Sequence, residues 1–364
     1  MDNLATTARG LKLLAVMRAT DAAVYKDLYP LLMLDEVESL TVIRPGTYRY
    51  APPLPRTEMI EVKDGSGIGR AWRCLREARN LLDTERIDAV LSFNPFPYGW
   101  VAHRAAKRGG VPSHVGFIGT DWWRWASRWV TLRSWLGSVD AITCTGSRMR
   151  RDMVQAGLSP SAIRILPHAV DVDRMDATPA VSDRFDAIFM GRLVSVKRVE
   201  LILRAFAYVV AGRPTARLAI AGDGPDAGVL RDLTGRLGLE GHVVFTGWVD
   251  DPTPWLKASK LVLMASASEG MPFSLIEGMC CGCVPVSVDV GDVNDHIRHD
   301  HNGVIVQPEP RDMALAIEEL LADAPRLDAL SERARRKREQ CGYPAAAAAW
   351  KELLRDPLRC DGDR

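Results

Sequence analysis

In its second half the chain reads Ser266-Ala-Ser-Glu-Gly-Met-Pro-Phe-Ser-Leu-Ile-Glu-Gly-Met279. Glu269 falls in a loop, because a glycine follows it and Pro272 suits the first turn of a helix, where its missing N–H group costs nothing. Glu277 then lies inside that helix. The apolar run Leu261-Val-Leu-Met264 before the loop predicts a buried parallel strand. The pattern therefore predicts a strand, a loop with one carboxylate, and a helix N-terminus with a second carboxylate.

These parts indicate the chemistry of a ligand. A helix N-terminus attracts phosphate groups, and carboxylates accept hydrogen bonds from hydroxyl groups. A ligand that carries both phosphates and hydroxyls, such as a nucleotide sugar, would use every part of the pattern.

Length and composition are typical of a globular protein with two domains. The chain has 364 residues, 47% hydrophobic and 26% charged, and a net charge of +1, which gives no general attraction to nucleic acid or membranes. No apolar run approaches the roughly 18 residues of a spanning helix, and the N-terminus lacks a signal-peptide pattern. We therefore expect a cytoplasmic protein with no nucleic-acid partner.

Three of the seven cysteines crowd into Cys280-Cys281-Gly282-Cys283. A metal site would need further ligands at suitable spacing, and none is evident. The Asp171-Val-Asp173 triplet falls in a polar stretch where a solvated turn is favoured over a metal site. We expect no metal, and we interpret the cysteines as small buried residues.

Short apolar runs alternate with longer helical segments, which is typical of βαβ units. The predicted strands are Leu13–Met17, Leu40–Ile43, Met59–Val62, Ala89–Ser92, Val115–Ile118, Ala141–Cys144 and Ala162–Leu166 in the first half, and Asp186–Met190, Arg217–Ala221, His242–Phe245, Leu261–Met264, Val284–Ser287 and Val304–Val306 in the second. Helices are predicted over Val199–Val210, Ala227–Leu237 and, anchored by Trp350, Ala345–Leu358.

The predicted fold class is α/β, with two doubly wound, Rossmann-like domains facing a cleft that receives ligands at the strand carboxyl ends. We assign residues 1–172 to a first domain, 173–184 to a linker and 185–342 to a second domain, which would bind the nucleotide sugar. Residues 343–364 are assigned to a C-terminal helix that crosses back to the first domain.

A second motif, Gly191-Arg192-Leu-Val-Ser-Val-Lys197, follows the first predicted strand of the second domain. Gly191 permits a tight exit from the strand, and two cations near a helix start would stabilise a diphosphate leaving group. An ordinary strand-to-helix turn with two solvated cations fits the motif equally well. Further on, Gly247 and Trp248 end another strand, where they would border a nucleobase.

Taken together, these motifs resemble those of the retaining GT-B glycosyltransferases of family 4, also called group 1. The resemblance becomes specific where Glu269-x7-Glu277 is combined with Gly191-Arg192-x4-Lys197, and it covers Asp140 to about Gln307. It implies that Arg192 and Lys197 hold the donor diphosphate, and that Glu269 contacts the transferred sugar.

The resemblance also implies the rest of the donor site. Glu277 would hydrogen-bond the ribose, and no metal would be needed because the cations and the helix end replace it. The implied donor-binding residues are Gly191, Gly247, Trp248, Gly270, Met271, Pro272, Phe273, Ser274, Leu275 and Glu277. The donor would be a UDP- or GDP-linked sugar, and no other cofactor is implied.

The first domain departs from the family pattern. Its first strand is followed by Arg18-Ala-Thr-Asp21 and not by a glycine-rich loop, and Ile118 takes the place of the histidine in a His-Gly-x-Asp motif that continues with Thr120 and Asp121. Acceptor contacts are expected at Thr120, Asp121, Ser147 and Asn94, although Asn94 fits a simple proline-shaped turn equally well. His114 is interpreted as a core histidine inside a strand.

The segment 122–136 is rich in tryptophan and arginine. One helical face would carry Trp122, Trp125, Trp129, Leu132 and Leu136, and another Arg124 and Arg128. Such a helix suits a membrane interface, which would place the protein peripherally at the inner membrane face. A helix packed against its own sheet is the alternative.

We therefore expect a glycosyltransferase that moves a hexose or related sugar from a nucleotide sugar to a glycan, lipid-linked or small-molecule hydroxyl, in polysaccharide or glycoside synthesis. A non-catalytic nucleotide-sugar-binding subunit is the alternative, favoured by the departures in the first domain. A glycoside hydrolase would need two carboxyl groups flanking a glycosidic bond, and it would leave Arg192 and Lys197 without a role.

Overall fold

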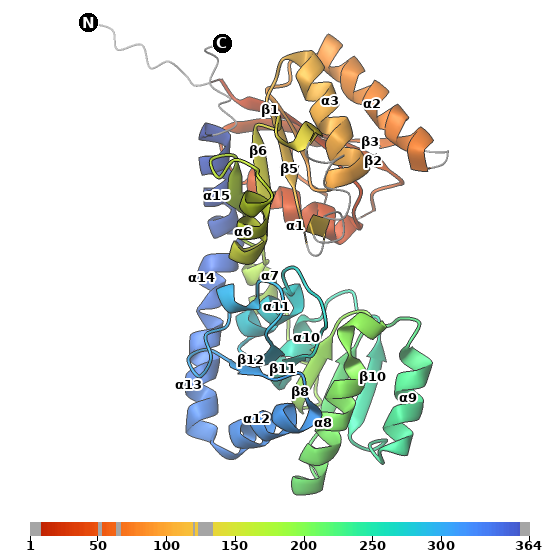
Figure 1. Ribbon diagram of the computed structural model, residues 1–364, viewed down its shortest axis with the longest axis vertical. Coiled ribbons are helices and arrows are strands. Elements are labelled where there is room, and N and C mark those ends of the chain that lie inside the picture. The colour runs from red at the N-terminus through yellow and green to blue at the C-terminus, as the bar shows by residue number, and fades with distance from the viewer. Residues whose placement is uncertain (1–8, 50–52, 63–66, 119–120, 123–133, 357–364) are drawn as a thin grey trace, which may run out of the picture. The chain divides into compact units, whose positions relative to one another are not determined.

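The computed structural model describes residues 9–49, 53–62, 67–118, 121–122 and 134–356. The chain divides into two compact units (Figure 1). Unit 1 comprises Met1–Ala169 and Tyr343–Arg364, and unit 2 comprises Val170–Gly342. Each unit is built on one parallel sheet, so the predicted α/β class with two doubly wound sheets is confirmed.

Unit 1 contains a seven-stranded parallel sheet in the order β3-β2-β1-β4-β5-β6-β7. The chain therefore reverses its direction of winding between β1 and β4, which pair directly. The strands are β1 (Leu11–Val16), β2 (Val37–Pro45), β3 (Thr57–Val62), β4 (Ala89–Ser92), β5 (Ser113–Gly116), β6 (Ala141–Cys144) and β7 (Ile163–Ile165).

The two faces of this sheet bury alternate residues of the strands. Leu13 and Ala15 pack under α1 and α15, whereas Leu14 and Val16 pack under α2 and α3. The helices of unit 1 are α1 (Asp21–Leu32), α2 (Gly67–Thr84), η1 (Pro95–Gly99), α3 (Trp100–Gly109), α6 (Ser147–Gln155) and α15 (Tyr343–Arg355).

Unit 2 contains a six-stranded parallel sheet in the order β10-β9-β8-β11-β12-β13. The winding reverses between β8 and β11, and ligands of such sheets bind outside the strand carboxyl ends at this point. The strands are β8 (Phe185–Met190), β9 (Leu218–Ala221), β10 (Val243–Gly247), β11 (Ser259–Met264), β12 (Val284–Val288) and β13 (Val304–Val306).

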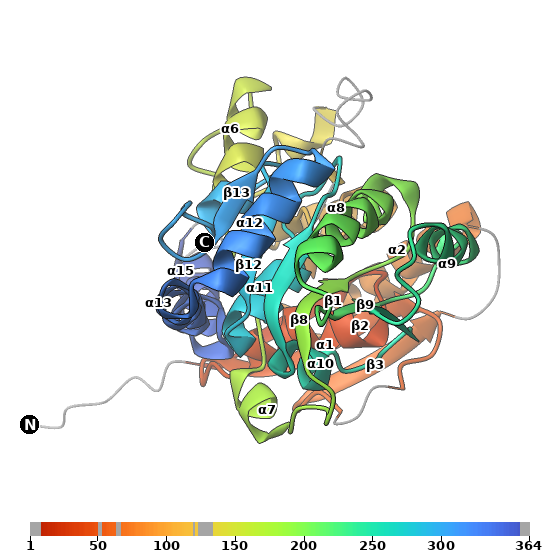
Figure 2. The same cartoon turned by 90° about the horizontal axis from the view of Figure 1, so that it is seen from below.

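The helices of unit 2 are also sorted between two faces. Phe189 and Leu263 pack in the core under α8, α9 and α12, and Ile188 and Val262 pack on the opposite face with α10 and α11. Figure 2 shows α8 and α12 side by side on the first of these two faces. The helices are α7 (Val172–Ala177), η2 (Ser195–Lys197), α8 (Val199–Gly212), α9 (Ala227–Arg236), α10 (Thr253–Lys257), α11 (Phe273–Cys281), η3 (Val293–Asp295), α12 (Pro310–Ala322), α13 (Ala324–Arg335) and α14 (Lys337–Cys341).

Two boundaries differ from those expected from the sequence. The segment 173–184, interpreted as a linker, belongs to unit 2, and its first five residues lie in α7. The N-cap residue of this helix, Asp171, accepts a hydrogen bond from the Arg174 backbone amide. The strand predicted over Val115–Ile118 is β5, and it ends at Gly116 because its pairing with β6 stops there. Phe117 continues the apolar run but packs as a core residue beyond the strand.

The C-terminal helix α15 packs on unit 1, next to α1. Trp350 is 1% exposed, as expected for an anchor, and its ring lies 5.7 Å from that of Phe93 and 5.2 Å from that of His114. His114 is a buried residue of β5, so its interpretation as a core histidine is confirmed. Its Nε2 hydrogen-bonds Thr143 Oγ1 at 2.8 Å, and burial lowers its pKa to about 3.

Among the described residues, none of the helices is long and apolar enough to cross a lipid bilayer.

Candidate functional site

The carboxyl ends of five strands of unit 2 are joined by backbone hydrogen bonds between their loops. The Gly191 amide after β8 donates to Ala221 O of β9 at 3.0 Å, and the Gly222 amide donates to Gly247 O of β10 at 2.9 Å. The Ala267 amide after β11 donates to Val196 O at 2.8 Å, and the Asp292 amide after β12 donates to Gly270 O at 2.9 Å. These loops therefore form one connected surface at this edge of the sheet.

Glycine makes this close loop packing possible. A Cβ atom on Gly222 would lie 1.9 Å from Gly191 O, and one on Gly291 would lie 2.4 Å from the carbonyl oxygens of both Glu269 and Gly270. Gly291 also has a φ of +57°, which side chains other than glycine rarely adopt. The loop that carries Glu269 is thus held against the loop after β12 with no room for a side chain.

Lys197 and Glu269, predicted separately as donor contacts, form an ion pair across the β8 and β11 loops. Lys197 Nζ lies 2.5 Å from Glu269 Oε1, and the two side chains are 25% and 10% exposed. Charge-assisted hydrogen bonds of this kind are short and strong. The winding reversal between β8 and β11 therefore holds a lysine and a carboxylate together at the edge where ligands bind.

Arg192 lies on the same loop as Lys197 but is exposed. Leu193, the next residue, is fully buried and hydrogen-bonds the β9 loop through both its amide and its carbonyl, which fixes the backbone beside Arg192. Within the described part of the chain, the Arg192 guanidinium has no hydrogen-bond or ion-pair partner. Its cation is carried by the loop between β8 and α8 that also carries Lys197.

Glu277 lies inside α11, as the sequence predicts. Pro272 is the N-cap residue, with extended φ and ψ of −81° and 90°, so the helix begins at Phe273. Glu277 is 7% exposed and belongs to the second turn, which places a buried carboxylate close to the positive end of the helix.

The residues predicted to line the donor between the two glutamates differ in what they expose. Met271 and Leu275 are 4% and 1% exposed and pack in the core, and the Leu275 amide donates to Pro272 O at 3.1 Å. Phe273 and Ser274 are partly exposed, and Gly270 is buried. Side-chain contacts from this segment to a ligand are therefore available at Phe273 and Ser274, and not at Met271 or Leu275.

Gly247 and Trp248 lie at the end of β10. Gly247 has a φ of +71°, which turns the chain sharply out of the strand. Trp248 is 66% exposed, and its indole N–H donates to Asp250 Oδ1 at 3.0 Å. The hydrogen bond fixes one edge of an indole whose ring remains exposed.

The predicted acceptor-side residues lie in unit 1. Asn94 follows β4, and its Oδ1 accepts a hydrogen bond of 2.7 Å from the Arg18 amide after β1, across the winding reversal of that sheet. Ser147 begins α6 after β6, and its Oγ accepts from Arg151 at 3.1 Å. Asp121 is partly exposed, and Thr120 lies outside the described residues. The structure thus joins Asn94 to Arg18.

The segment 122–136 is described only at its ends. Trp122 is 3% exposed and packs edge-on against Phe117 with ring centroids 5.8 Å apart, and Trp135 and Leu136 are 9% and 1% exposed in the same core cluster. Trp122 and Leu136 are core residues, which at these two positions favours the alternative of packing against the sheet over a membrane face. Trp125, Trp129, Leu132, Arg124 and Arg128 lie outside the described residues.

Cys280, Cys281 and Cys283 are buried, as interpreted from the sequence. Burial raises the pKa of the Cys281 thiol to about 11 and raises the pKa of the Cys280 and Cys283 thiols as well, so all three stay protonated near neutral pH. Among the described residues, no three His, Cys, Asp or Glu side chains come together in a way that could hold a metal ion.

Comparison with known sequences decides the family. Residues 173–337 match the family "Glycosyl transferases group 1", and residues 35–174 match "Glycosyltransferase Family 4". The chain belongs to glycosyltransferase family 4. The match over 173–337 includes Arg192, Lys197, Glu269 and Glu277.

Curated relatives of this family 4 chain resemble part of it. A D-inositol 3-phosphate glycosyltransferase of Thermobispora bispora is 31% identical over 221 residues, which cover 57% of this chain and 51% of that protein. The lipopolysaccharide core biosynthesis glycosyltransferase LpsE of Rhizobium meliloti is 30% identical over 212 residues, which cover 56% and 60%. The chain thus spans about half the length of the curated relatives it matches.

Solved structures extend the likeness of the fold over nearly the whole chain. The Anabaena protein HepE in complex with UDP superposes with a TM-score of 0.81 at 15% identity, covering 95% of this chain and all of that one. A sucrose-phosphate synthase of Thermosynechococcus elongatus gives a TM-score of 0.77 at 15% identity, covering 94% and 98%. The family 4 chain therefore has the GT-B fold.

Proposed function

We propose that this chain transfers a sugar from a nucleotide-sugar donor to a hydroxyl acceptor, with retention of anomeric configuration. The observation that carries the proposal is the Lys197–Glu269 pair, held at the winding reversal of unit 2, on a loop that also carries the exposed Arg192. A cation suited to phosphate and a carboxylate suited to sugar hydroxyls lie together there. A nucleotide sugar needs both at the point where its diphosphate joins its sugar.

Bond cleavage builds negative charge on the departing diphosphate. The bond between the anomeric carbon and the phosphate oxygen breaks, and both electrons leave with the phosphate. Lys197 and Arg192 stabilise this charge in the transition state. Arg192 is free to bind a phosphate, whereas the position of the Lys197 ammonium group is already fixed by its ion pair with Glu269. Binding of the diphosphate gives Lys197 a second anionic partner.

Glu269 positions the sugar. Lys197 occupies Oε1 of the carboxylate, and among the described residues Oε2 has no hydrogen-bond donor. A carboxylate oxygen accepts up to two hydrogen bonds, so Oε2 is suited to sugar hydroxyls. The same side chain thus orients the phosphate-binding lysine through one oxygen and the transferred sugar through the other.

The nucleoside half of the donor would lie between Glu277 and Trp248. Ribose hydroxyls donate to the Glu277 carboxylate, and the nucleobase stacks near the exposed indole of Trp248. UDP-glucose is the first donor to test, because HepE, which shares the fold, has been solved in complex with it.

The acceptor is a hydroxyl group of a glycan, a lipid-linked molecule or a small molecule. As its oxygen bonds to the anomeric carbon, its proton passes to an oxygen of the leaving phosphate, so no histidine at position 118 is required. Asn94, Asp121 and Ser147 are the proposed acceptor contacts on unit 1, and no metal takes part.

The test has two stages. Melting temperature is measured with UDP-, GDP- and ADP-linked sugars, and ligand at a hundred times its dissociation constant should stabilise the protein by about 2.7 kcal/mol. Release of the nucleoside diphosphate is then measured with the stabilising donor and a panel of hydroxyl acceptors. Acceptor-dependent release by the wild type is the expected result.

A negative result in the release assay and a negative result in the binding assay have different meanings. Stabilisation by a donor, together with no release in the presence of any acceptor, would favour the non-catalytic binding subunit. If no nucleotide sugar raises the melting temperature while the protein is folded, the assignment of the donor site is wrong.

A further inference from the structure

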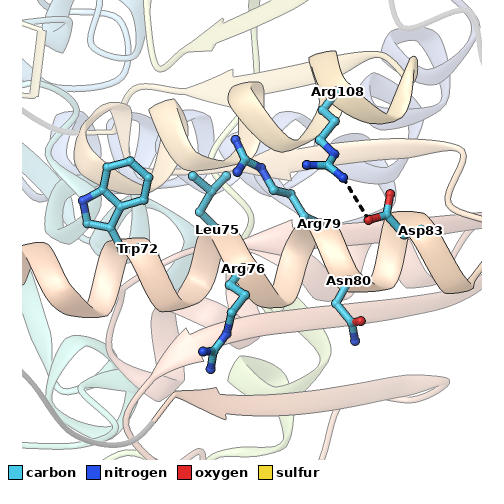
Figure 3. A pocket seen from close by; sticks show the side chains of 7 residues that line it. All are labelled: Trp72, Leu75, Arg76, Arg79, Asn80, Asp83 and Arg108. Atoms are coloured by element: carbon cyan, nitrogen blue, oxygen red, sulfur yellow. Dashed lines mark hydrogen bonds and ion pairs between the residues drawn. The ribbon is translucent and has the colours of Figure 1, made fainter.

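A shallow groove lies between α2 and α3 of unit 1, and none of the proposed acceptor contacts lines it. It has a volume of about 360 Å³ and is lined by three arginines together with Trp72, Leu75, Asn80 and Asp83. Figure 3 shows the side chains of Arg76, Arg79 and Arg108 along it, with Arg108 bridged to Asp83 at 3.3 Å. The wall is therefore cationic, although the groove is open to solvent.

The positive charge continues beyond the groove. A second hollow of about 200 Å³ is lined entirely by Arg79, Arg104, Lys107 and Arg108. The helices α2 and α3 together carry seven Arg and Lys residues and two Asp and Glu residues, a net charge of +5, whereas the whole chain has a net charge of +1. The excess charge of this surface is thus local, and it calls for an anionic partner.

The other end of the groove is apolar and exposed. Trp72 contacts Trp100 edge-on with ring centroids 6.1 Å apart, and the guanidinium carbon of Arg104 lies over the Trp100 ring, 5.6 Å from its centroid. Ile68 is 76% exposed and Trp72 is 57% exposed. Ile68 and Trp72 are four residues apart in α2, so they lie on the same face of the helix. Folding leaves these two large apolar groups in water, where each costs free energy unless something covers it.

We propose that this surface, comprising Ile68, Trp72, Arg76, Arg79, Arg104, Lys107 and Arg108 and named here the α2–α3 surface, docks on an anionic lipid bilayer. Lipid phosphates meet the guanidinium groups along the groove, and Ile68 and Trp72 enter the boundary between headgroups and acyl chains. A nucleic acid or a free polyphosphate would satisfy the cations but would leave the exposed Ile68 uncovered. The surface goes beyond the transfer reaction, because it includes none of the proposed donor or acceptor contacts.

The test is co-sedimentation of the full chain with vesicles. Wild-type protein should bind vesicles of phosphatidylglycerol and phosphatidylcholine, should not bind vesicles of phosphatidylcholine alone, and should be released as salt is raised. The double variant Arg76→Glu/Arg108→Glu should bind the anionic vesicles at least about 30-fold more weakly, since each basic residue near such a surface contributes about fivefold. Trp72→Ser should weaken binding several-fold without changing its salt dependence.

The matched control is Arg204→Glu/Arg336→Glu, which makes the same change of net charge on two exposed arginines of unit 2. It should bind as the wild type does. Melting temperatures of all variants show that each is folded. Equal binding of the α2–α3 variant and the wild type would overturn the proposal. So would binding of free polyphosphate that competes fully with vesicles and is unaffected by Trp72→Ser, because the surface would then be a polyanion site.

Discussion

Two lysine–carboxylate pairs join the same strands of unit 2, β8 and β11, at opposite ends. Lys197 and Glu269 pair at 2.5 Å on the loops beyond the carboxyl ends, and Lys260 and Asp186 pair at 2.8 Å at the amino ends. The carboxylates are buried to a similar degree, 10% and 15% exposed, but Lys260 is 53% exposed and Lys197 only 25%. The residue types are nearly the same, so the surroundings decide what each pair does.

The surroundings differ in what they leave available. Asp186 uses its second oxygen to accept a hydrogen bond of 3.1 Å from the Arg217 amide at the start of β9, so its carboxylate is committed to the sheet. Glu269 has no such donor for Oε2 among the described residues, and the α11 N-terminus and Arg192 lie on neighbouring loops. The same kind of ion pair is therefore a candidate ligand site at the carboxyl end of the parallel sheet, where a carboxylate oxygen remains available, and a structural contact at the amino end.

The largest difference is expected on replacing the two lysines. Lys197→Ala should slow sugar transfer by a factor of 10² to 10³, because one charge-stabilising contact to the leaving diphosphate is lost. Lys260→Ala should leave transfer unchanged. The measurement is the rate of nucleoside diphosphate release at saturating donor and acceptor, with circular dichroism to verify folding. Equal rates in the two variants would remove the distinction between the two ends of the sheet.

The second test concerns the loops that hold Glu269. Gly291→Ala would place a Cβ atom 2.4 Å from two carbonyl oxygens, and it should lower stability by about 1–3 kcal/mol more than the control through overpacking. Gly238→Ala is that control, because its φ of +67° is close to the +57° of Gly291 and a Cβ there would meet nothing within 4 Å. Urea unfolding of both variants gives the difference. If the two substitutions cost the same free energy, the Glu269 loop is less tightly held than the contacts indicate.

The sequence predicts Lys197 and Glu269 individually as site residues, but it does not predict that they form an ion pair. Strands such as β6 and β13 have the predicted bounds because apolar β-branched runs end at polar or turn residues. Lys197 and Glu269 are separated by 72 positions, and their meeting depends on β8 lying beside β11, an adjacency that alternating strands and helices do not specify.

The choice between a membrane face and a core face of the segment 122–136 also depends on tertiary packing. The tryptophan spacing in 122–136 predicts an amphipathic helix, but an apolar stripe packs equally well into a core, as Trp122 does. The α2–α3 surface was missed, although a signal was present. Arg70, Arg73, Arg76 and Arg79 recur every third residue. Which of them faces α3 becomes visible only when the two helices are packed together.

A smaller effect is expected on neutralising Glu269. Glu269→Gln should weaken the sugar nucleotide about 10- to 30-fold while leaving the free nucleoside diphosphate nearly unaffected, because hydrogen bonds from sugar hydroxyls to a charged acceptor are weakened. Glu277→Gln should weaken both ligands, since ribose is common to both, and Asp186→Asn should weaken neither. Calorimetric titration of both ligands against the three variants checks the division. Equal losses for both ligands in Glu269→Gln would show that this residue does not contact the sugar.

The smallest effect is expected in the stability of the amino-end pair. A double-mutant cycle with Lys260→Met and Asp186→Asn should give a coupling energy below about 1 kcal/mol, because Lys260 is half exposed and water screens its charge. Asp186→Asn alone should cost more than Lys260→Met, since it also weakens the bond to the Arg217 amide. The same cycle on Lys197→Met and Glu269→Gln should give a larger coupling in the absence of ligand, because both partners are less exposed. Saturating nucleoside diphosphate should then reduce that coupling, as Lys197 shares its charge with the phosphates, while the Lys260–Asp186 coupling stays constant. A ligand-independent coupling at both ends would mean that Lys197 serves the fold in the same way as Lys260, and that Arg192 alone meets the diphosphate.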